Sequence, residues 1–179
     1  MTKQEKIEKL IQMEWEDFQK VNNEGGRASC QDDPETFFIM RRSHFAPWTE
    51  ELIDCVQADM DRAPAHGRGP YPTLAGEQWS DAIVKQQLAW MEEYQAKYPV
   101  LASGNRLLYS SEDTPYDTSF QTYLLGELRT YSDSTLHAYW QFINELKKEG
   151  KSLALLTMEA EVKAYGYEGL DAAEKALSK

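Results

Sequence analysis

The chain has 179 residues, of which 41% are hydrophobic, 27% charged and 12% aromatic, a composition typical of a folded globular protein and not of a disordered one. Its formal net charge is −11, which argues against a nucleic-acid backbone or an anionic membrane as the main partner, because both require a basic surface. Two cysteines are too few for an iron–sulfur cluster or an all-cysteine zinc site.

The sequence also carries no membrane-targeting pattern. No apolar run approaches the roughly 20 residues of a membrane span, and no signal peptide precedes the first predicted helix. We therefore expect a cytoplasmic protein with reduced thiols, formed by one domain over residues 1–179. No motif identifies a cofactor.

Helical patterns dominate the chain. A capping box of Thr2 and Glu5 predicts a first helix to about Val21, which the glycines of residues 22–26 end. An Asp33-Pro34 pair predicts the start of a second helix. The remaining helical patterns cover residues 49–60, 80–98, 117–131, 134–149, 152–165 and a short stretch from Leu170.

Two segments between these helices are predicted to be irregular. Residues 63–72 are rich in Gly and Pro, and residues 100–115 form a polar loop in which Asp113, with Asp117 just beyond it, supplies turns or caps. There is no convincing strand pair or repeat. The sequence thus predicts an all-α single domain of about seven or eight helices, in a bundle-like or orthogonal array.

Two glutamates stand where a helical stripe should be apolar. A carboxylate buried without a partner costs several kcal/mol, so each needs a partner, a proton or a role. The stripe around Glu14 consists of Ile7, Leu10, Ile11, Phe18 and Val21. The stripe around Glu127 consists of Phe120, Tyr123, Leu124, Leu128 and Tyr131.

The second predicted helix adds a cation and a histidine to this set. Arg41 and His44 share one arc with Phe37 and Met40, so both should face the interior. Arginine keeps its charge in proteins, and a buried Arg41 therefore needs a carboxylate. Two interpretations stay open. The charges form a buried ion pair that sets helix register, or they form a cleft that positions and protonates a small polar substrate.

Under the second interpretation, Glu14 and Glu127 are the candidate general acid and base, and Arg41 holds an anionic group of a small polar or anionic substrate. Cys30 lies just before the cap of the second helix, where a thiol can become nucleophilic, and it is a further candidate catalytic residue. The alternative for Cys30 is a small packed residue.

The candidate substrate-binding residues are Asn22, Arg27, Asp32 and His44. Of these, Arg27 follows two glycines, which suggests a phosphate-binding turn. That segment matches no P-loop or dinucleotide fingerprint, and a helix stop with a tight turn is the simpler interpretation.

Two rival functions use other features. Two Glu and one His could bind a metal ion, but the sequence has no Glu-x-x-His or His-Glu-x-x-His pattern, so no metal site is predicted. A non-catalytic module would instead bind a protein partner or a second copy through surface aromatics. The candidates for that surface are Trp48, Trp79, Trp90 and Trp140.

Two long blocks resemble an uncharacterised bacterial family catalogued as domain of unknown function 4125. The first contains EWEDFQ (14–19), VNNEGGRASCQDD (21–33), TF (36–37) and IMRRS (39–43), and the second SSEDT (110–114), TSFQTYL (118–124), GEL (126–128) and TYS (130–132). The resemblance implies that relatives usually have Gln where this chain has His44, which argues against a general catalytic role for His44, and Arg where this chain has Leu125. It also implies longer relatives with a nucleotidyltransferase-like domain, a hint of nucleotide-linked work, but no activity.

Overall fold

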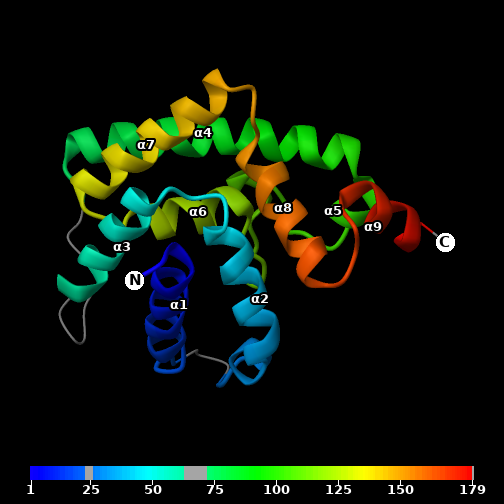
Figure 1. Ribbon diagram of the computed structural model, residues 1–179, viewed down its shortest axis with the longest axis horizontal. Coiled ribbons are helices and arrows are strands. Elements are labelled where there is room, and N and C mark those ends of the chain that lie inside the picture. The colour runs from blue at the N-terminus through cyan, green and yellow to red at the C-terminus, as the bar shows by residue number, and fades with distance from the viewer. Residues whose placement is uncertain (23–25, 63–71, 179) are drawn as a thin grey trace.

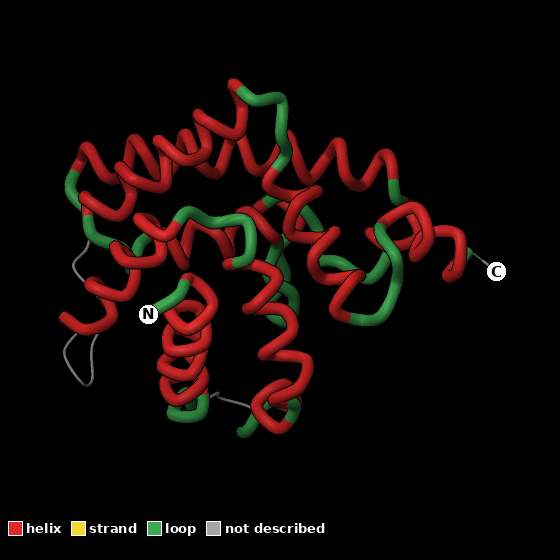
Figure 2. Tube along the Cα trace, viewed as in Figure 1, coloured by secondary structure: helices red, strands yellow, loops and turns green. Residues whose placement is uncertain are grey.

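The computed structural model describes residues 1–22, 26–62 and 72–178, and every regular element within these ranges is a helix, which confirms the all-α class (Figures 1 and 2). The predicted Gly- and Pro-rich loop and most of the predicted stop at residues 22–26 lie outside the described residues. In chain order the elements are α1 (Lys3–Phe18), the 3-10 helix η1 (Ser29–Asp32), α2 (Pro34–Phe45), α3 (Glu50–Arg62), α4 (Leu74–Lys97), α5 (Pro99–Ala102), the 3-10 helix η2 (Ser110–Glu112), α6 (Phe120–Leu128), α7 (Asp133–Lys148), α8 (Leu153–Ala164) and α9 (Leu170–Leu177).

The first two helices begin at their predicted caps. Thr2 and Glu5 form the capping box of α1, and the Asp33 carboxylate accepts a backbone N–H at the start of α2. Each cap satisfies a backbone donor of the first turn that has no partner inside the helix, so these starts are visible in the sequence. The predicted end of α1 is less accurate, because the helix ends at Phe18 and not near Val21.

The predicted start of α4 is wrong. The helix begins at Leu74 and not at Ser80. Asp133, the first residue of α7, accepts hydrogen bonds from the backbone N–H and the hydroxyl of Thr73, immediately before α4. This anchor comes from a residue far away in the chain, so a local pattern does not reveal it.

The segment before α6 is more ordered than predicted, because it contains α5 and η2. Asp113 has the predicted capping role and accepts hydrogen bonds from the Ser119 backbone N–H, at 2.6 Å, and from the Thr122 hydroxyl. The residue that caps α6 is Ser119 and not Asp117, since the Ser119 hydroxyl accepts the Thr122 backbone N–H.

The helices form an orthogonal array. In Figure 1, α4 and α7 run side by side across one side of the molecule, and α3, α6 and α8 pack against this pair. Helices α1 and α2 pack against each other and point away from that layer, with α1 also touching α3 and α2 touching α8. Helices α5 and α9 pack together beyond one end of α4.

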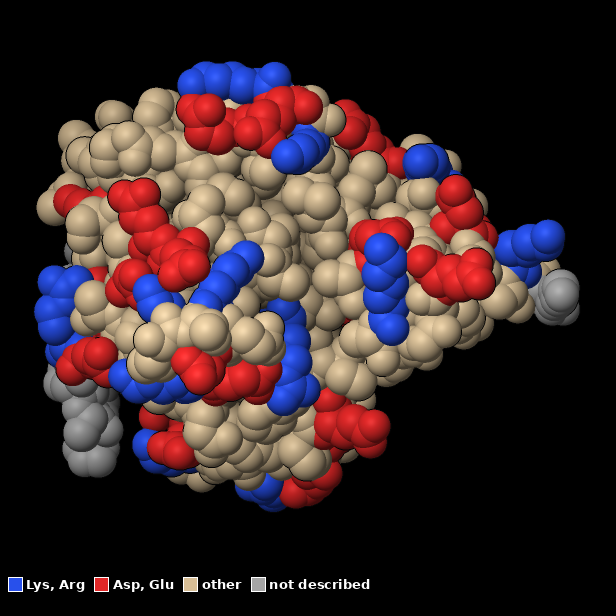
Figure 3. Space-filling model, in the orientation of Figure 1, with Lys and Arg blue, Asp and Glu red and all other residues tan. Residues whose placement is uncertain are grey.

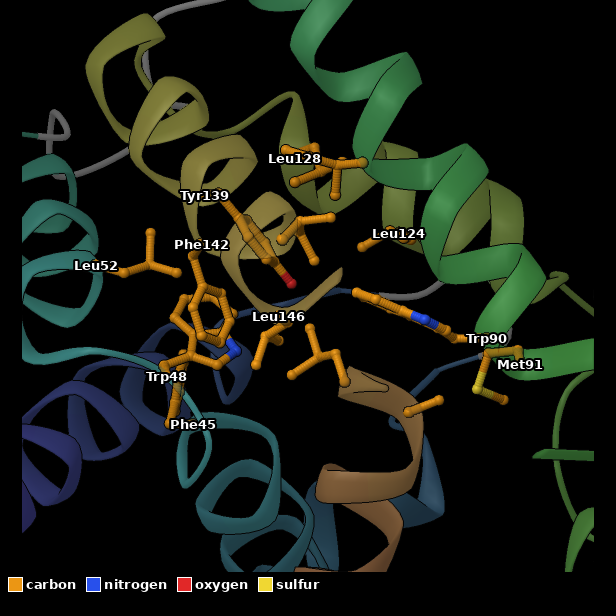
Figure 4. Close-up of a cluster of buried hydrophobic side chains, with 14 of the residues drawn as sticks. Phe45, Trp48, Leu52, Trp90, Met91, Leu124, Leu128, Tyr139, Phe142 and Leu146 are labelled. Atoms are coloured by element: carbon orange, nitrogen blue, oxygen red, sulfur yellow. The ribbon is translucent and has the colours of Figure 1, made fainter. Parts of the chain in front are cut away.

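Aromatic rings join the corner between α2 and α3 to α7 (Figure 4). The Trp48 ring lies 4.8 Å from the Tyr139 ring and 4.9 Å from the Phe45 ring, centroid to centroid. Trp48 is only 1% exposed. This contact fixes the C-terminal end of α2, the helix that carries Arg41 and His44.

The prediction of an aromatic binding surface is wrong for two of its four tryptophans. Trp48 and Trp90 are both buried. Trp79 and Trp140 are half-buried, and their rings lie on either side of His137, at centroid distances of 4.9 and 6.1 Å. Trp79 of α4 thus contacts His137 of α7, and half-buried rings of this kind are ordinary packing elements.

The apolar stripes of α1 and α6 direct their glutamates inward. In α1, Leu10 and Ile11 are fully buried, and Glu14 follows at helical spacing on the same face. In α6, Leu124 and Leu128 are buried, and Glu127 lies one turn after the first of them. Burial of the leucines therefore brings both carboxylates to the interior.

The first prediction concerns the close approach of α4 to α7. A Cβ added at Gly76 would overlap Asp133 Oδ1 and lie 2.6 Å from Pro72 Cβ. We expect Gly76→Ala to destabilise the protein by about 1–3 kcal/mol through overpacking. The matched control is Gly126→Ala in α6, where no atom lies within 4 Å of the new Cβ. This substitution should be neutral or should stabilise the protein by up to about 1 kcal/mol. Urea unfolding of both variants checks this, and equal effects would contradict it.

Candidate functional site

Three helices bring four ionisable side chains together. The Arg41 guanidinium of α2 donates through Nε to Glu14 Oε2 of α1 at 2.7 Å and through Nη2 to Glu14 Oε1. The same Nη2 donates to Glu127 Oε1 of α6 at 3.2 Å. His44 Nε2 lies 3.9 Å from that oxygen. The predicted pairing of Arg41 with a carboxylate is confirmed, and it involves both glutamates.

This cluster is largely removed from water. The side chains of Arg41, Glu14 and Glu127 are 14%, 18% and 17% exposed, and that of His44 is 24% exposed. The Arg41 guanidinium carbon lies 4.7 Å from the centre of the Phe45 ring. Charges in such surroundings interact more strongly than surface charges, and each of them needs a partner.

Tyr131 joins the cluster, although the sequence did not single it out as a functional residue. Its hydroxyl donates to Glu127 Oε1 at 3.1 Å, and the side chain is buried. Tyr131 lies beyond the end of α6, yet it comes four residues after Glu127. That spacing was the available signal, because residues four apart on a helical turn are neighbours.

One cation facing two carboxylates pushes their pKa values apart. Burial is the largest influence on Glu14 and raises its pKa, aided by repulsion from Glu127, against the opposing charge and hydrogen bonds of Arg41. Burial also acts to raise the pKa of Glu127. There the charges of Arg41 and His44, with hydrogen bonds from Arg41 and Tyr131, outweigh burial and lower it.

Each carboxyl group accepts two hydrogen bonds, Glu14 both from Arg41 and Glu127 one each from Arg41 and Tyr131. One guanidinium neutralises the charge of only one carboxylate. The pair consequently holds a proton more readily than a simple ion pair does.

His44 is neutral in this environment. Burial, followed by the positive charge of Arg41, lowers the pKa of His44 to about 4, against the opposing influence of Glu127. Its Nε2 atom is buried and has no hydrogen-bond partner among the described residues. The imidazole ring packs on Trp48, 4.9 Å away between centroids. The side chain thus presents an unused nitrogen next to Glu127.

The other predicted site residues lie in the connection between α1 and α2, away from the cluster. Arg27 donates hydrogen bonds to the Asp32 carboxylate and to the Gln31 carbonyl, each at 2.7 Å. The Arg27 and Asp32 side chains therefore stabilise the connection between α1 and α2. Asn22 and Cys30 are exposed.

Packed aromatic rings separate the two regions. Phe18 and Phe37 stack at 5.4 Å, and each lies one helical turn nearer the connection than Glu14 or Arg41. The structure therefore joins Glu14, Arg41, His44 and Glu127 into one group and does not bring the residues of the α1–α2 connection into it.

Two further properties describe the surroundings. Among the described residues, no group of at least three His, Cys, Asp or Glu side chains is placed to hold a metal ion. A hollow of about 870 Å³ lies between α3 and α7, lined in part by Leu52, Trp140 and Lys148, and it does not include the cluster. On the face shown in Figure 3, basic and acidic side chains are intermixed.

The comparison with known families gives a single result. Residues 4–175 match the family described as "Protein of unknown function (DUF4125)". The chain belongs to this family. The match spans both sequence blocks and all four residues of the cluster, and it confirms the resemblance seen in the sequence. No curated protein and no solved structure matches the chain. No helix among the described residues is long and apolar enough to cross a membrane.

The second prediction tests the charge balance of the cluster. Arg41→Gln leaves two carboxylates without their cation, which should destabilise the protein by about 3 kcal/mol at pH 7.5. Without Arg41, burial and mutual repulsion hold both carboxyl pKa values above those of the unfolded chain. Their ionisation then opposes folding, so the loss should shrink as the pH falls from 7.5 to 5.

Arg42→Gln is the control for this variant. It removes the exposed pair between Arg42, which lies on α2 like Arg41, and Glu8 of α1, which should contribute about 0–1 kcal/mol. Urea unfolding at both pH values measures the two effects. A loss of stability in Arg41→Gln that does not depend on pH would contradict the account.

The third prediction concerns His44. Its pKa is about 4 in the folded protein and near its ordinary value of 6.5 in the unfolded chain. The unfolded chain therefore binds this proton more readily, and stability should fall as the pH drops from about 6.5 to 4. His44→Gln should flatten this part of the stability profile. NMR titration of the imidazole measures the pKa directly, and a value near 6.5 would refute the prediction.

Proposed function

We propose that this protein is a small enzyme that performs acid–base chemistry on a small polar substrate at the cluster of Glu14, Arg41, His44 and Glu127. The observation that supports the proposal is the sharing of one guanidinium by two carboxylates, with opposite shifts of their pKa values. Pairs of titratable groups whose surroundings drive their pKa values apart are the usual basis for assigning an acid and a base.

The roles follow from these shifts. Glu14, with the raised pKa, is the general acid, and Glu127, with the lowered pKa, is the general base. Arg41 holds both carboxylates in place. Tyr131 fixes the orientation of Glu127 through its hydrogen bond. His44 contacts the substrate through its unused nitrogen.

The surroundings allow this use. The four side chains of the cluster retain 14–24% exposure, and we expect a small molecule to reach them from solvent. We place the protein in the cytoplasm, where the free Cys30 and Cys55 thiols would stay reduced. Cys30 remains a proposed accessory nucleophile, and Asn22, Arg27 and Asp32 remain proposed contacts for a larger substrate.

One observation favours a second function, in which the charges only fix the register of α1, α2 and α6. Arg41 contacts Glu14 through two parallel hydrogen bonds, the geometry of a specific structural pair. In that case the protein binds a partner or a second copy at another surface, and the hollow between α3 and α7 is the candidate binding surface.

The fourth prediction separates these functions. The purified protein is incubated with a small-molecule extract of its own cells, and changes over time are followed by untargeted mass spectrometry. We expect one compound to be consumed and another to appear, and Glu127→Gln to slow this turnover by at least about 100-fold, as expected when a general base is lost.

Two controls make the result specific. Glu8→Gln alters only exposed contacts, with Arg42 and Gln4, and should turn over at the wild-type rate. Circular dichroism and thermal unfolding establish that Glu127→Gln is folded. No turnover by the wild type, with a loss of stability as the main effect of Glu14→Gln and Glu127→Gln, would support the register function instead.

A further inference from the structure

The cluster carries an unbalanced charge. When both carboxyl groups are ionised, Glu14 and Glu127 contribute two negative charges, Arg41 contributes one positive charge, and His44 is neutral. The sum is one negative charge in a place that is mostly shielded from water. Exposed charges nearby do little to correct it, because solvent and salt screen them.

Two hydrogen-bonding positions in the cluster are also open. Glu127 Oε1 receives hydrogen bonds from Arg41 and Tyr131, whereas no described residue donates to Glu127 Oε2. His44 Nε2 is buried without a partner among the described residues, 3.9 Å from Oε1. A carboxylate oxygen accepts hydrogen bonds, and a neutral imidazole nitrogen can accept one as well.

We propose that the ligand of this site carries a positively charged nitrogen, a primary ammonium group being the best match, held between Glu127 and His44. This inference rests on the proposed function and names its substrate class. An ammonium supplies one positive charge and three N–H donors, so it can neutralise the cluster and donate to both open positions. An anionic group would instead add a second unbalanced charge in poorly hydrated surroundings.

The contacts of Arg41 argue in the same direction. We expected Arg41 to hold an anionic substrate group, but its Nε and Nη2 atoms already donate to the two glutamates. An anion could reach the guanidinium only in competition with carboxylates that are fixed on α1 and α6. A cation meets no such competition at Glu127.

A tyrosine at the edge of the cluster provides access and apolar contact. Tyr123, one helical turn before Glu127, is 47% exposed, and its pKa is raised first by the charge of Glu127 and then by burial. The Arg106 guanidinium carbon lies 4.9 Å from the centre of the Tyr123 ring, and Arg106 is an exposed residue. An aliphatic amine could thus place its ammonium at Glu127 and its carbon chain against Tyr123.

The fifth prediction tests this inference with three probes of equal size: n-butylammonium, n-butanol and butyrate. The His44 imidazole signals are followed by NMR at pH 7.5 in 150 mM NaCl, with the signals of His137, which lies between α4 and α7, as an internal reference. We expect n-butylammonium to shift the His44 signals in a saturable manner, with an affinity at least ten times that of the other two probes. Glu127→Gln should abolish the shift, and Glu8→Gln should retain it.

Several outcomes would overturn the inference. Equal responses to n-butanol, a preference for butyrate, or an unchanged response in Glu127→Gln would show that charge does not select the ligand. Saturation of the His44 signals by Mg²⁺ or Mn²⁺ at lower concentrations than the amine would indicate a metal ligand instead. Turnover of a neutral or anionic compound in the extract experiment would leave the proposed enzyme in place while removing the amine as its substrate class.

Discussion

A single guanidinium between two carboxylates determines how α1, α2 and α6 meet. Arg41 lies on α2, and its partners come from helices that precede and follow it in the chain, so the contact is satisfied only when all three helices are in place. Because these side chains are 14–18% exposed, water cannot fully replace a lost partner. The contact therefore links all three helices.

The rest of the fold holds these helices where the contact requires them. The corner between α2 and α3 is fixed by Trp48, which packs on Tyr139 of α7. The position of α6 is set by Asp113, which binds the backbone at Ser119, and by the burial of Leu124 and Leu128. These contacts involve ordinary packing and capping, and they hold in place the helices that carry Arg41 and Glu127.

The charge imbalance has consequences for both stability and chemistry. A buried pair of carboxylates facing one cation is less favourable for folding than a matched ion pair, because one negative charge lacks a partner. The same imbalance splits the carboxyl pKa values, and within the described part of the chain no residue donates to Glu127 Oε2 or pairs with His44 Nε2. Enzymes use such unsatisfied groups, since a substrate can complete them. Membership of the DUF4125 family establishes kinship, so the cluster is the feature from which an activity can be inferred.

Local patterns determined the helices and the inward direction of the charges. Caps such as Thr2 and Asp33 act within four residues, and the period of the apolar stripes placed Glu14, Arg41 and Glu127 on buried faces, so the sequence alone was sufficient for both. The tertiary structure decided which residues meet. Only the packing of distant helices shows that Arg41 binds both glutamates and that Asp133 anchors the start of α4. The same packing shows that Trp48 and Trp90 are buried, and that Arg27 and Asp32 pair with each other away from the cluster. Contacts between residues far apart in the chain depend on the relative placement of whole helices, and the period of a single helix carries no information about that placement.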